Sequence, residues 1–185
     1  MQDYRININY AKALYLLAED THEQDRVAED MRLVHQVCAE NRILNVIFSN
    51  PEVKSSKKAD IITDLYSQHV CKTTMAFLIF VVRKKRSVNL RGISDAYINL
   101  YRESHGIVLS QFTTADPADE AAKAIVTKAV AEYTHKTVEL KTKEDPNIIG
   151  GFALEFDNTM YDARISTYLA KMRRGFEQNS YESKL

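Results

Sequence analysis

The sequence predicts two domains of different class: an all-α six-helix bundle over residues 1–105 and a small α+β domain over residues 106–185. Before Gly106, apolar residues recur at helical spacing in successive segments, and Gly106 is itself a favourable helix C-terminus. From Ile107 to Ala115 the chain is rich in β-forming residues, and later segments alternate apolar and charged residues. A hydrophobic content of 45% supports a core for such domains.

The first predicted helix runs from Tyr10 to Asp20. Its apolar side chains cover about half of the circumference or more, a wider arc than a surface helix of a small bundle needs. Two interpretations stay open. The helix is buried on two sides, or one side packs inward while the other forms part of a groove for a partner helix.

Five further helices are predicted before Gly106. The second carries Val27, Met31, Val34 and Cys38 at helical spacing, and the short third helix ends at Asn50-Pro51 because the residue before proline avoids the α region. The fifth contains Met75 to Val82, which periodicity alone would also allow as a buried strand; its helical neighbours favour a central helix. The predicted capping residues of the second, fourth and fifth helices are Thr21 (in a capping box with Gln24), Ser55 or Ser56, and Thr73 or Thr74. Ser87 can start the sixth helix.

The second domain is predicted to have the order β-α-β-β-α. After the first strand, Asp116-Pro117 is expected to begin a helix, and Val138 and Leu140 mark the next strand. The apolar face of the first helix is expected at Ala121, Ala122, Ile125, Ala129, Val130 and Tyr133. The last helix places Ile165, Tyr168, Leu169, Met172 and Phe176 on one side, and we expect this side to complete the small core.

A hairpin precedes the last helix in the stretch KEDPNIIGGFALEFDNTMYDARI, residues 143–165. Asp145-Pro146-Asn147 and Asp157-Asn158 are turn sequences. Gly150-Gly151 stands where a strand begins and indicates a bulge or a close approach of another backbone segment. Phe152 to Phe156 alternates as a strand does, and Asp162 can cap the helix that follows.

This ordered stretch resembles the C-terminal signature of the ATP synthase delta subunit family, the bacterial counterpart of the oligomycin sensitivity conferral protein. The matching residues are Asp145, Ile148, Ile149, Gly150, Gly151, Phe152 to Phe156 and Asp162. Arg164 stands where the family usually has serine. YAKALY, from Tyr10 to Tyr15, is similar to the opening of the family's first helix.

The resemblance implies a non-catalytic stator component of F-type ATP synthase. It links the catalytic head to the b subunits of the peripheral stalk, so that rotary ion transport is coupled to ATP synthesis. In the family the N-terminal domain receives the N-terminal helix of an alpha subunit between its first and fifth helices, and the C-terminal domain engages the b subunits. The residues expected to bind the alpha helix are Tyr10, Ala11, Leu14, Tyr15, Ala18, Phe77, Leu78 and Val81. The implied location is peripheral, at the cytoplasmic face of the bacterial inner membrane, with membrane contact only through partners.

Composition and motifs argue against other classes. The net charge is zero and the one dense basic run, Arg83 to Arg86, falls at a predicted helix end, where cations favour the macrodipole. The competing class is an RNA-binding or regulatory helical adaptor. The even charge balance argues against it, and no nucleic-acid partner is expected. The two cysteines set no disulfide framework, and the N-terminus lacks a signal-peptide pattern.

No catalytic residue, metal or cofactor is predicted. The five histidines are scattered, and His35 and Cys38 have no second ligand pair at zinc spacing. Asp157 and Asp162 are interpreted as turn and cap residues rather than an acid–base pair. A small hydrolase is a third option, but the sequence names no nucleophile and base for it.

Overall fold

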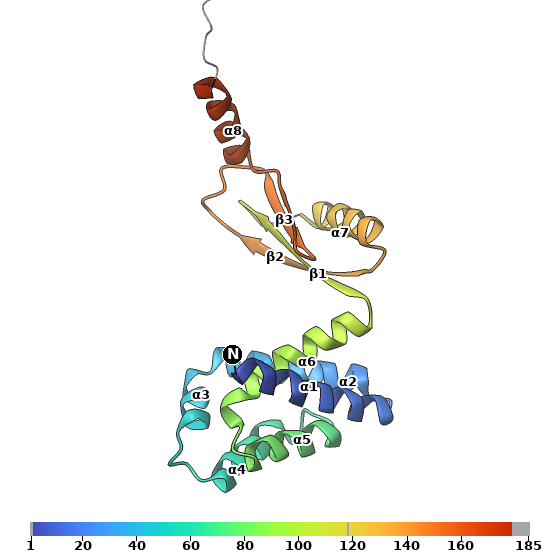
Figure 1. Cartoon of the computed structure of the whole chain (residues 1–185), viewed down its shortest axis with the longest axis vertical. Coiled ribbons are helices and arrows are strands. Elements are labelled where there is room, and N and C mark those ends of the chain that lie inside the picture. Colours follow the sequence, from blue (N-terminus) through green and yellow to red (C-terminus); the bar gives the residue numbers. More distant parts are fainter. Residues whose placement is uncertain (1, 118, 179–185) are drawn as a thin grey trace, which may run out of the picture. The chain divides into compact units, whose positions relative to one another are not determined.

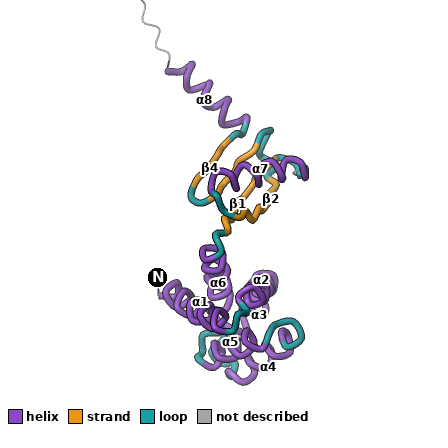
Figure 2. The backbone as a smooth tube through the Cα atoms, turned by 90° about the vertical axis from the view of Figure 1, so that its right-hand side faces the viewer, coloured by secondary structure: helices purple, strands orange, loops and turns teal. Residues whose placement is uncertain are grey.

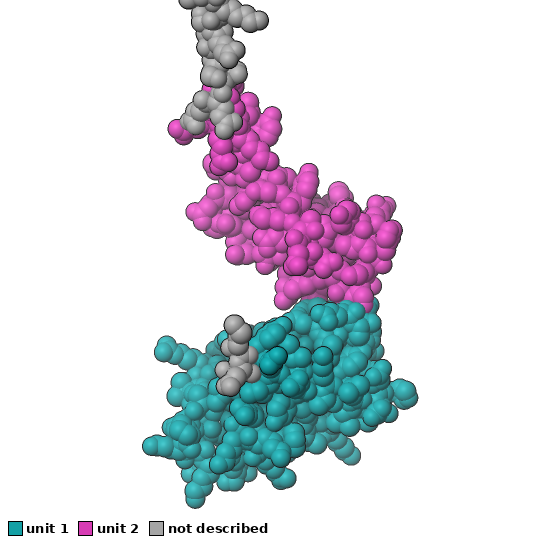
Figure 3. Space-filling view, viewed as in Figure 1, with its two compact units in different colours: residues 1–105 teal, residues 106–185 magenta. Residues whose placement is uncertain are grey.

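The computed structural model describes residues 2–117 and 119–178, and it divides the chain into two compact units, Met1–His105 and Gly106–Leu185 (Figure 3). Unit 1 contains α1 (Gln2–Asp20), α2 (Gln24–Glu40), α3 (Arg42–Ser49), α4 (Ser55–Tyr66), α5 (Lys72–Arg83), a short 3-10 helix η1 (Ser87–Asn89) and α6 (Leu90–Ser104) (Figure 1). Unit 2 contains β1 (Ile107–Thr114), α7 (Glu120–Thr134), β2 (Thr137–Glu144), β3 (Phe152–Phe156), β4 (Thr159–Asp162) and α8 (Ile165–Gln178). The predicted class, helices followed by a small sheet with its own helices, is confirmed.

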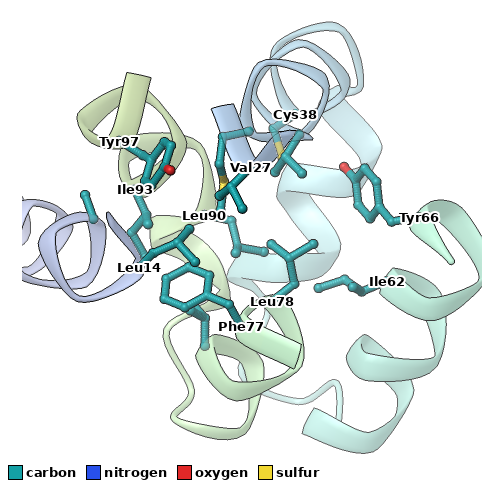
Figure 4. Close-up of a cluster of buried hydrophobic side chains, with 14 of the residues drawn as sticks. Leu14, Val27, Cys38, Ile62, Tyr66, Phe77, Leu78, Leu90, Ile93 and Tyr97 are labelled. Atoms are coloured by element: carbon teal, nitrogen blue, oxygen red, sulfur yellow. The ribbon is translucent and has the colours of Figure 1, made fainter. Parts of the chain in front are cut away.

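The core of unit 1 is built where α6 packs against both α1 and α2, with α5 and α4 closing it (Figure 2). Leu14, Met31, Leu78, Ile93 and Tyr97 are fully buried, and they come from four different helices. Figure 4 shows Leu14, Phe77 and Leu78 in one cluster with Leu90 and Ile93. Because burial of each large apolar side chain stabilises the fold by about 1.5–3 kcal/mol, this cluster holds the helices together.

Unit 2 is a mixed sheet in the order β2-β1-β3-β4. Strands β1 and β2 pair in parallel, which requires a crossover, and α7 supplies it; β3 and β4 form an antiparallel hairpin. Helix α7 covers one face of the sheet by packing Val126 and Val130 against Phe112 and Leu154.

Several predicted helix starts are wrong, for local reasons. Helix α1 begins at Gln2 rather than Tyr10, since nothing in the preceding segment breaks a helix. The Thr21 hydroxyl donates to the carbonyl oxygens of Leu17 and Ala18, so it ends α1 and makes no capping box with Gln24. In α5 the cap is Cys71, whose sulfur accepts from the Thr74 amide.

The predicted apolar face of α7 is right at Ala122 and Val130 and wrong at its other positions. The helix begins at Glu120 rather than near Pro117. Its buried residues are Val126 and Val130, at i and i+4, while Ile125 and Tyr133 are largely exposed. Strand β4 was not predicted either. It follows Asp157-Asn158, whose positive φ values of 42° and 63° make the tight turn of the β3–β4 hairpin.

Helix α8 contradicts the prediction that it completes the core of unit 2. Its apolar residues Ile165, Tyr168, Leu169, Met172 and Phe176 are 44–75% exposed. The reason is that α7 already covers the apolar face of the sheet formed by Phe112, Leu154 and their neighbours. The apolar stripe of α8 is therefore a surface feature of this unit.

Candidate functional site

An open groove of about 490 Å³ lies between α1 and α5. Helix α1 contributes Asn9, Tyr10, Ala13 and Leu17 to it, and α5 contributes Ala76, Phe77 and Phe80. Leu17 and Phe80 keep 44% and 46% of their surface exposed. Large apolar side chains that converge on a groove and stay exposed are typical of a surface that binds the apolar face of a partner helix.

Aromatic contacts hold the two walls of this groove. The Tyr10 ring lies edge-on to Phe77, with centroids 6.4 Å apart, and its centroid is 6.3 Å from that of Phe80. Such ring pairs favour offset and edge-to-face geometry at this separation. The Lys84 ammonium lies 5.5 Å from the Phe80 centroid and adds a cation–π contact at the outer wall.

Only two of the residues expected to bind an alpha helix line the groove, namely Tyr10 and Phe77. Ala11, Leu14, Ala18, Leu78 and Val81 are at most 1% exposed and belong to the core of unit 1. Tyr15 is half-buried against Tyr97, with ring centroids 6.1 Å apart. The structure thus places most of the expected set inside the domain.

The physical reason is that α1 carries two apolar stripes at the same spacing. Residues 11, 14 and 18 form the stripe that packs inward, and residues 10, 13 and 17 form the neighbouring stripe about 100° away. Leu17 and Phe80 line the groove but are not among the residues predicted to bind the alpha helix. The broad apolar arc indicated that a second stripe existed, but only the packing of α6 on α1 decides which stripe is buried.

In unit 2, the segment from Asp145 to Arg164 leads from the end of β2 through the β3–β4 hairpin to α8. The Asp145 carboxylate accepts from the backbone and side-chain nitrogens of Asn147 at 3.0 and 2.8 Å, which closes the predicted turn. Gly151 has a φ of +80°, and a Cβ there would lie 2.2 Å from the Ala163 carbonyl oxygen. Gly151 is therefore at a close approach of two backbone segments.

Two backbone hydrogen bonds fasten residues 163–165, at the start of α8, to residues 150–152, at the start of β3. The Ala163 amide donates to the Phe152 carbonyl at 2.9 Å, and the Ile165 amide donates to the Gly150 carbonyl at 3.0 Å. A Cβ on Gly150 would come 2.8 Å from the Ile165 side chain, so both glycines leave room for the root of α8. The glycine pair thereby fixes the start of α8, the helix whose apolar side chains are exposed.

Asp162 is the polar centre of the same junction. It accepts from the Arg164 side chain at 2.6 and 2.9 Å, from the Arg164 amide at 3.0 Å, and from the Thr167 hydroxyl at 2.9 Å. The Arg164 side chain, followed by its amide, holds the pKa of Asp162 well below its usual range. Arg164 therefore forms an ion pair with Asp162 across the turn into α8.

Within the described residues there is no cluster of three or more His, Cys, Asp or Glu side chains that could hold a metal ion. No helix in the same part of the chain is long and apolar enough to cross a membrane.

The sequence model of the family described as "ATP synthase delta (OSCP) subunit" matches residues 6–176. The chain belongs to the ATP synthase delta (OSCP) family. The ATP synthase subunit delta of Parabacteroides distasonis is 33% identical over 174 residues, which cover 94% of this chain and 97% of that protein. That of Cytophaga hutchinsonii is 33% identical over 178 residues, 96% and 97% of the two chains.

The fold agrees with this membership. A chain of the mitochondrial ATP synthase hexamer of Toxoplasma gondii matches with a TM-score of 0.72 at 18% identity, over 92% of this chain and 97% of that one. As a delta-family subunit, the protein is a non-catalytic, peripheral stator component of ATP synthase. Its relatives give no support to the alternative of an RNA-binding or regulatory adaptor.

Proposed function

We propose that the groove between α1 and α5 receives the N-terminal helix of an ATP synthase alpha subunit. The observation that carries this proposal is the pair of exposed apolar walls, with Leu17 on one side and Phe80 on the other. An amphipathic helix would bury its apolar face there, and the aromatic residues Tyr10 and Phe80 would supply the large contact areas typical of binding hot spots.

Unit 2 is proposed to bind the b subunits of the peripheral stalk through α8. The support is the exposed apolar stripe of this helix, from Ile165 to Phe176, and the rigid root that Gly151 and Asp162 provide. An exposed stripe at helical spacing is a surface on which partner helices pack.

With two attachments at different units, the chain would hold the catalytic head still against the torque of the rotor. This task requires firm binding at both ends and no reaction in the chain itself. The proposed location is the cytoplasmic face of the bacterial inner membrane, with membrane contact only through the other subunits.

The groove is tested by Leu17→Asp in the full chain, with Leu16→Asp as the matched control. Both leucines are exposed and adjacent on α1, but only Leu17 lines the groove. Leu17→Asp should weaken binding of an alpha N-terminal peptide about tenfold or more, as the loss of a buried hot-spot contact does. Calorimetric titration measures the affinity, and circular dichroism should show unchanged helicity for both variants.

The proposal would be contradicted if both variants lost the same affinity for the alpha peptide, or if Leu17→Asp lost none. In either case the alpha helix would bind elsewhere. Ala18→Asp is unsuitable for this purpose. Ala18 has no exposed surface, so the new carboxylate would be buried without a partner and unit 1 would unfold.

A further inference from the structure

A second pocket of about 410 Å³ lies where the end of α3, the start of α4 and the connection from α5 to η1 meet. It shares no lining residue with the groove between α1 and α5. Lys54, Lys58 and Lys85 line it, and Glu52 is the one acidic side chain among its lining residues. The pocket therefore gathers positive charge in a chain whose net charge is zero.

Lys58 is the least expected of these residues, because its side chain is charged and only 7% exposed. Its ammonium donates to the Phe48 carbonyl oxygen at 2.8 Å and contacts the Ser87 hydroxyl at 3.5 Å. Ser87 in turn donates to the Phe48 carbonyl at 2.9 Å. Within the described residues no carboxylate pairs with Lys58, so a fixed, nearly buried cation has only neutral acceptors.

Buried ammonium groups are normally paired with an opposite charge, because the cost of removing them from water is otherwise several kcal/mol. An ammonium group has three N–H donors, and the Phe48 carbonyl and Ser87 hydroxyl engage at most two of them. The remaining donor is available to an acceptor in the pocket.

The start of α4 adds further donors at the same place. Its N-cap is Lys54, which provides no side-chain acceptor for the amides of the first helical turn, and Ser55 of that turn lines the pocket. Free amides and the helix dipole favour an anion at such an end. Lys85, with a φ of +58°, follows the end of α5 and lines the pocket as well.

We propose that this pocket binds a phosphate-type dianion. A tetrahedral oxyanion offers enough acceptor oxygens for the free donor of Lys58, the first-turn amides of α4 and the ammonium groups of Lys54 and Lys85. The phosphate can come from inorganic phosphate in solution or from the headgroup of an anionic lipid. The run Arg83 to Arg86, interpreted from the sequence as a favourable helix end, thus contributes one residue, Lys85, to the lining of a ligand pocket.

The test is binding of inorganic phosphate to the full chain, measured by calorimetric titration and by the melting temperature, with sodium chloride at equal ionic strength as reference. Phosphate should bind saturably and raise the melting temperature above that in chloride. Lys54→Gln and Lys85→Asn each remove an exposed pocket charge and should weaken the affinity about two- to fivefold, and their combination more. Asparagine is chosen at position 85 because it tolerates the left-handed backbone.

Lys57→Gln is the matched control, since Lys57 is exposed on the same helix but does not line the pocket. It should retain nearly wild-type affinity, and all three variants should bind an alpha N-terminal peptide as the wild type does. Phosphatidylcholine vesicles with and without phosphatidic acid form the second arm. Binding only to the acidic vesicles assigns the phosphate to a lipid headgroup, and saturable binding of inorganic phosphate assigns it to solution.

Three results would overturn the proposal: no binding in either arm, equal stabilisation by phosphate and chloride, or an equal loss of affinity in Lys57→Gln. The last two would indicate a general ionic effect on a basic surface.

Discussion

At the scale of single residues, the junction before α8 depends on one glycine and one carboxylate. Gly151 adopts a left-handed conformation with a carbonyl oxygen where a side chain would stand. Asp162 gathers hydrogen bonds from Arg164 and Thr167 at the same turn. Each residue has a consequence that a single substitution can measure.

Gly151→Ala should destabilise unit 2 by about 1–3 kcal/mol, because the new Cβ meets the Ala163 carbonyl and the backbone is strained at positive φ. Gly175→Ala is the matched control. Gly175 lies in α8 with open space around it, so alanine there should be neutral or stabilise the helix by up to about 1 kcal/mol. Urea unfolding of both variants measures the difference. Wild-type stability of Gly151→Ala would show that this segment can move away at no cost.

Arg164→Ser, which introduces the residue that the family resemblance led us to expect, should raise the pKa of Asp162 toward its ordinary value of 3.8. The side chain of Arg164 is the largest cause of the lowered pKa. A carboxylate with a lowered native pKa stabilises the fold above its unfolded pKa, and this contribution is lost as the pH falls through the native pKa. The stabilisation that the Asp162 carboxylate provides should therefore be smaller in the variant, and as the pH falls it should be lost at a higher pH than in the wild type.

An NMR titration of the Asp162 carboxyl carbon measures this shift directly. Lys171→Ser, which removes an exposed cation from α8 outside the junction, should leave the titration unchanged. An identical curve for Arg164→Ser and the wild type would contradict the role given to the ion pair.

At the scale of elements, α1 and α8 show opposite outcomes of the same apolar periodicity. Helix α1 has two apolar stripes, and packing against α6 buries one of them while the other lines the groove. Helix α8 has one stripe, and none of its large apolar residues is buried. Periodicity identifies an apolar face, but whether that face meets its own domain or a partner depends on which surfaces are already covered.

At the scale of the whole molecule, the two proposed attachments should be separable. A chain ending at Arg164 lacks α8 but keeps the sheet and its α7 cover, whose buried residues lie before α8. We expect its unit 2 to retain a cooperative melt and lose binding to the b subunits, while the alpha peptide still binds. Pull-downs with each partner measure both attachments, and the assembled complex should hydrolyse ATP without moving ions.

If the shortened chain still holds the b subunits, α8 is not the stalk-binding surface. If it loses the alpha peptide instead, the two units have been assigned to the wrong partners.

The sequence by itself determined the family, the fold class and the turns. The family follows from an ordered set of residues and the fold class from apolar periodicity, and the turns depend on local chemistry. Asp145, Gly151 and Asp157-Asn158 act through their own backbone conformation and nearest neighbours, and such preferences can be read from residue type. Helix starts were less well predicted, since Thr21 and Cys71 each had competing local partners.

Only the tertiary structure decided which apolar residues are core and which are surface. Ala18 and Leu17 are neighbours of similar character, yet one is fully buried and the other forms a groove wall. Lys58 lies far from Lys85 and Ser87 in the sequence, yet all three line one pocket. The physical reason is that burial is a property of pairs of elements: it depends on how helices and strands pack together, and no local pattern contains that information.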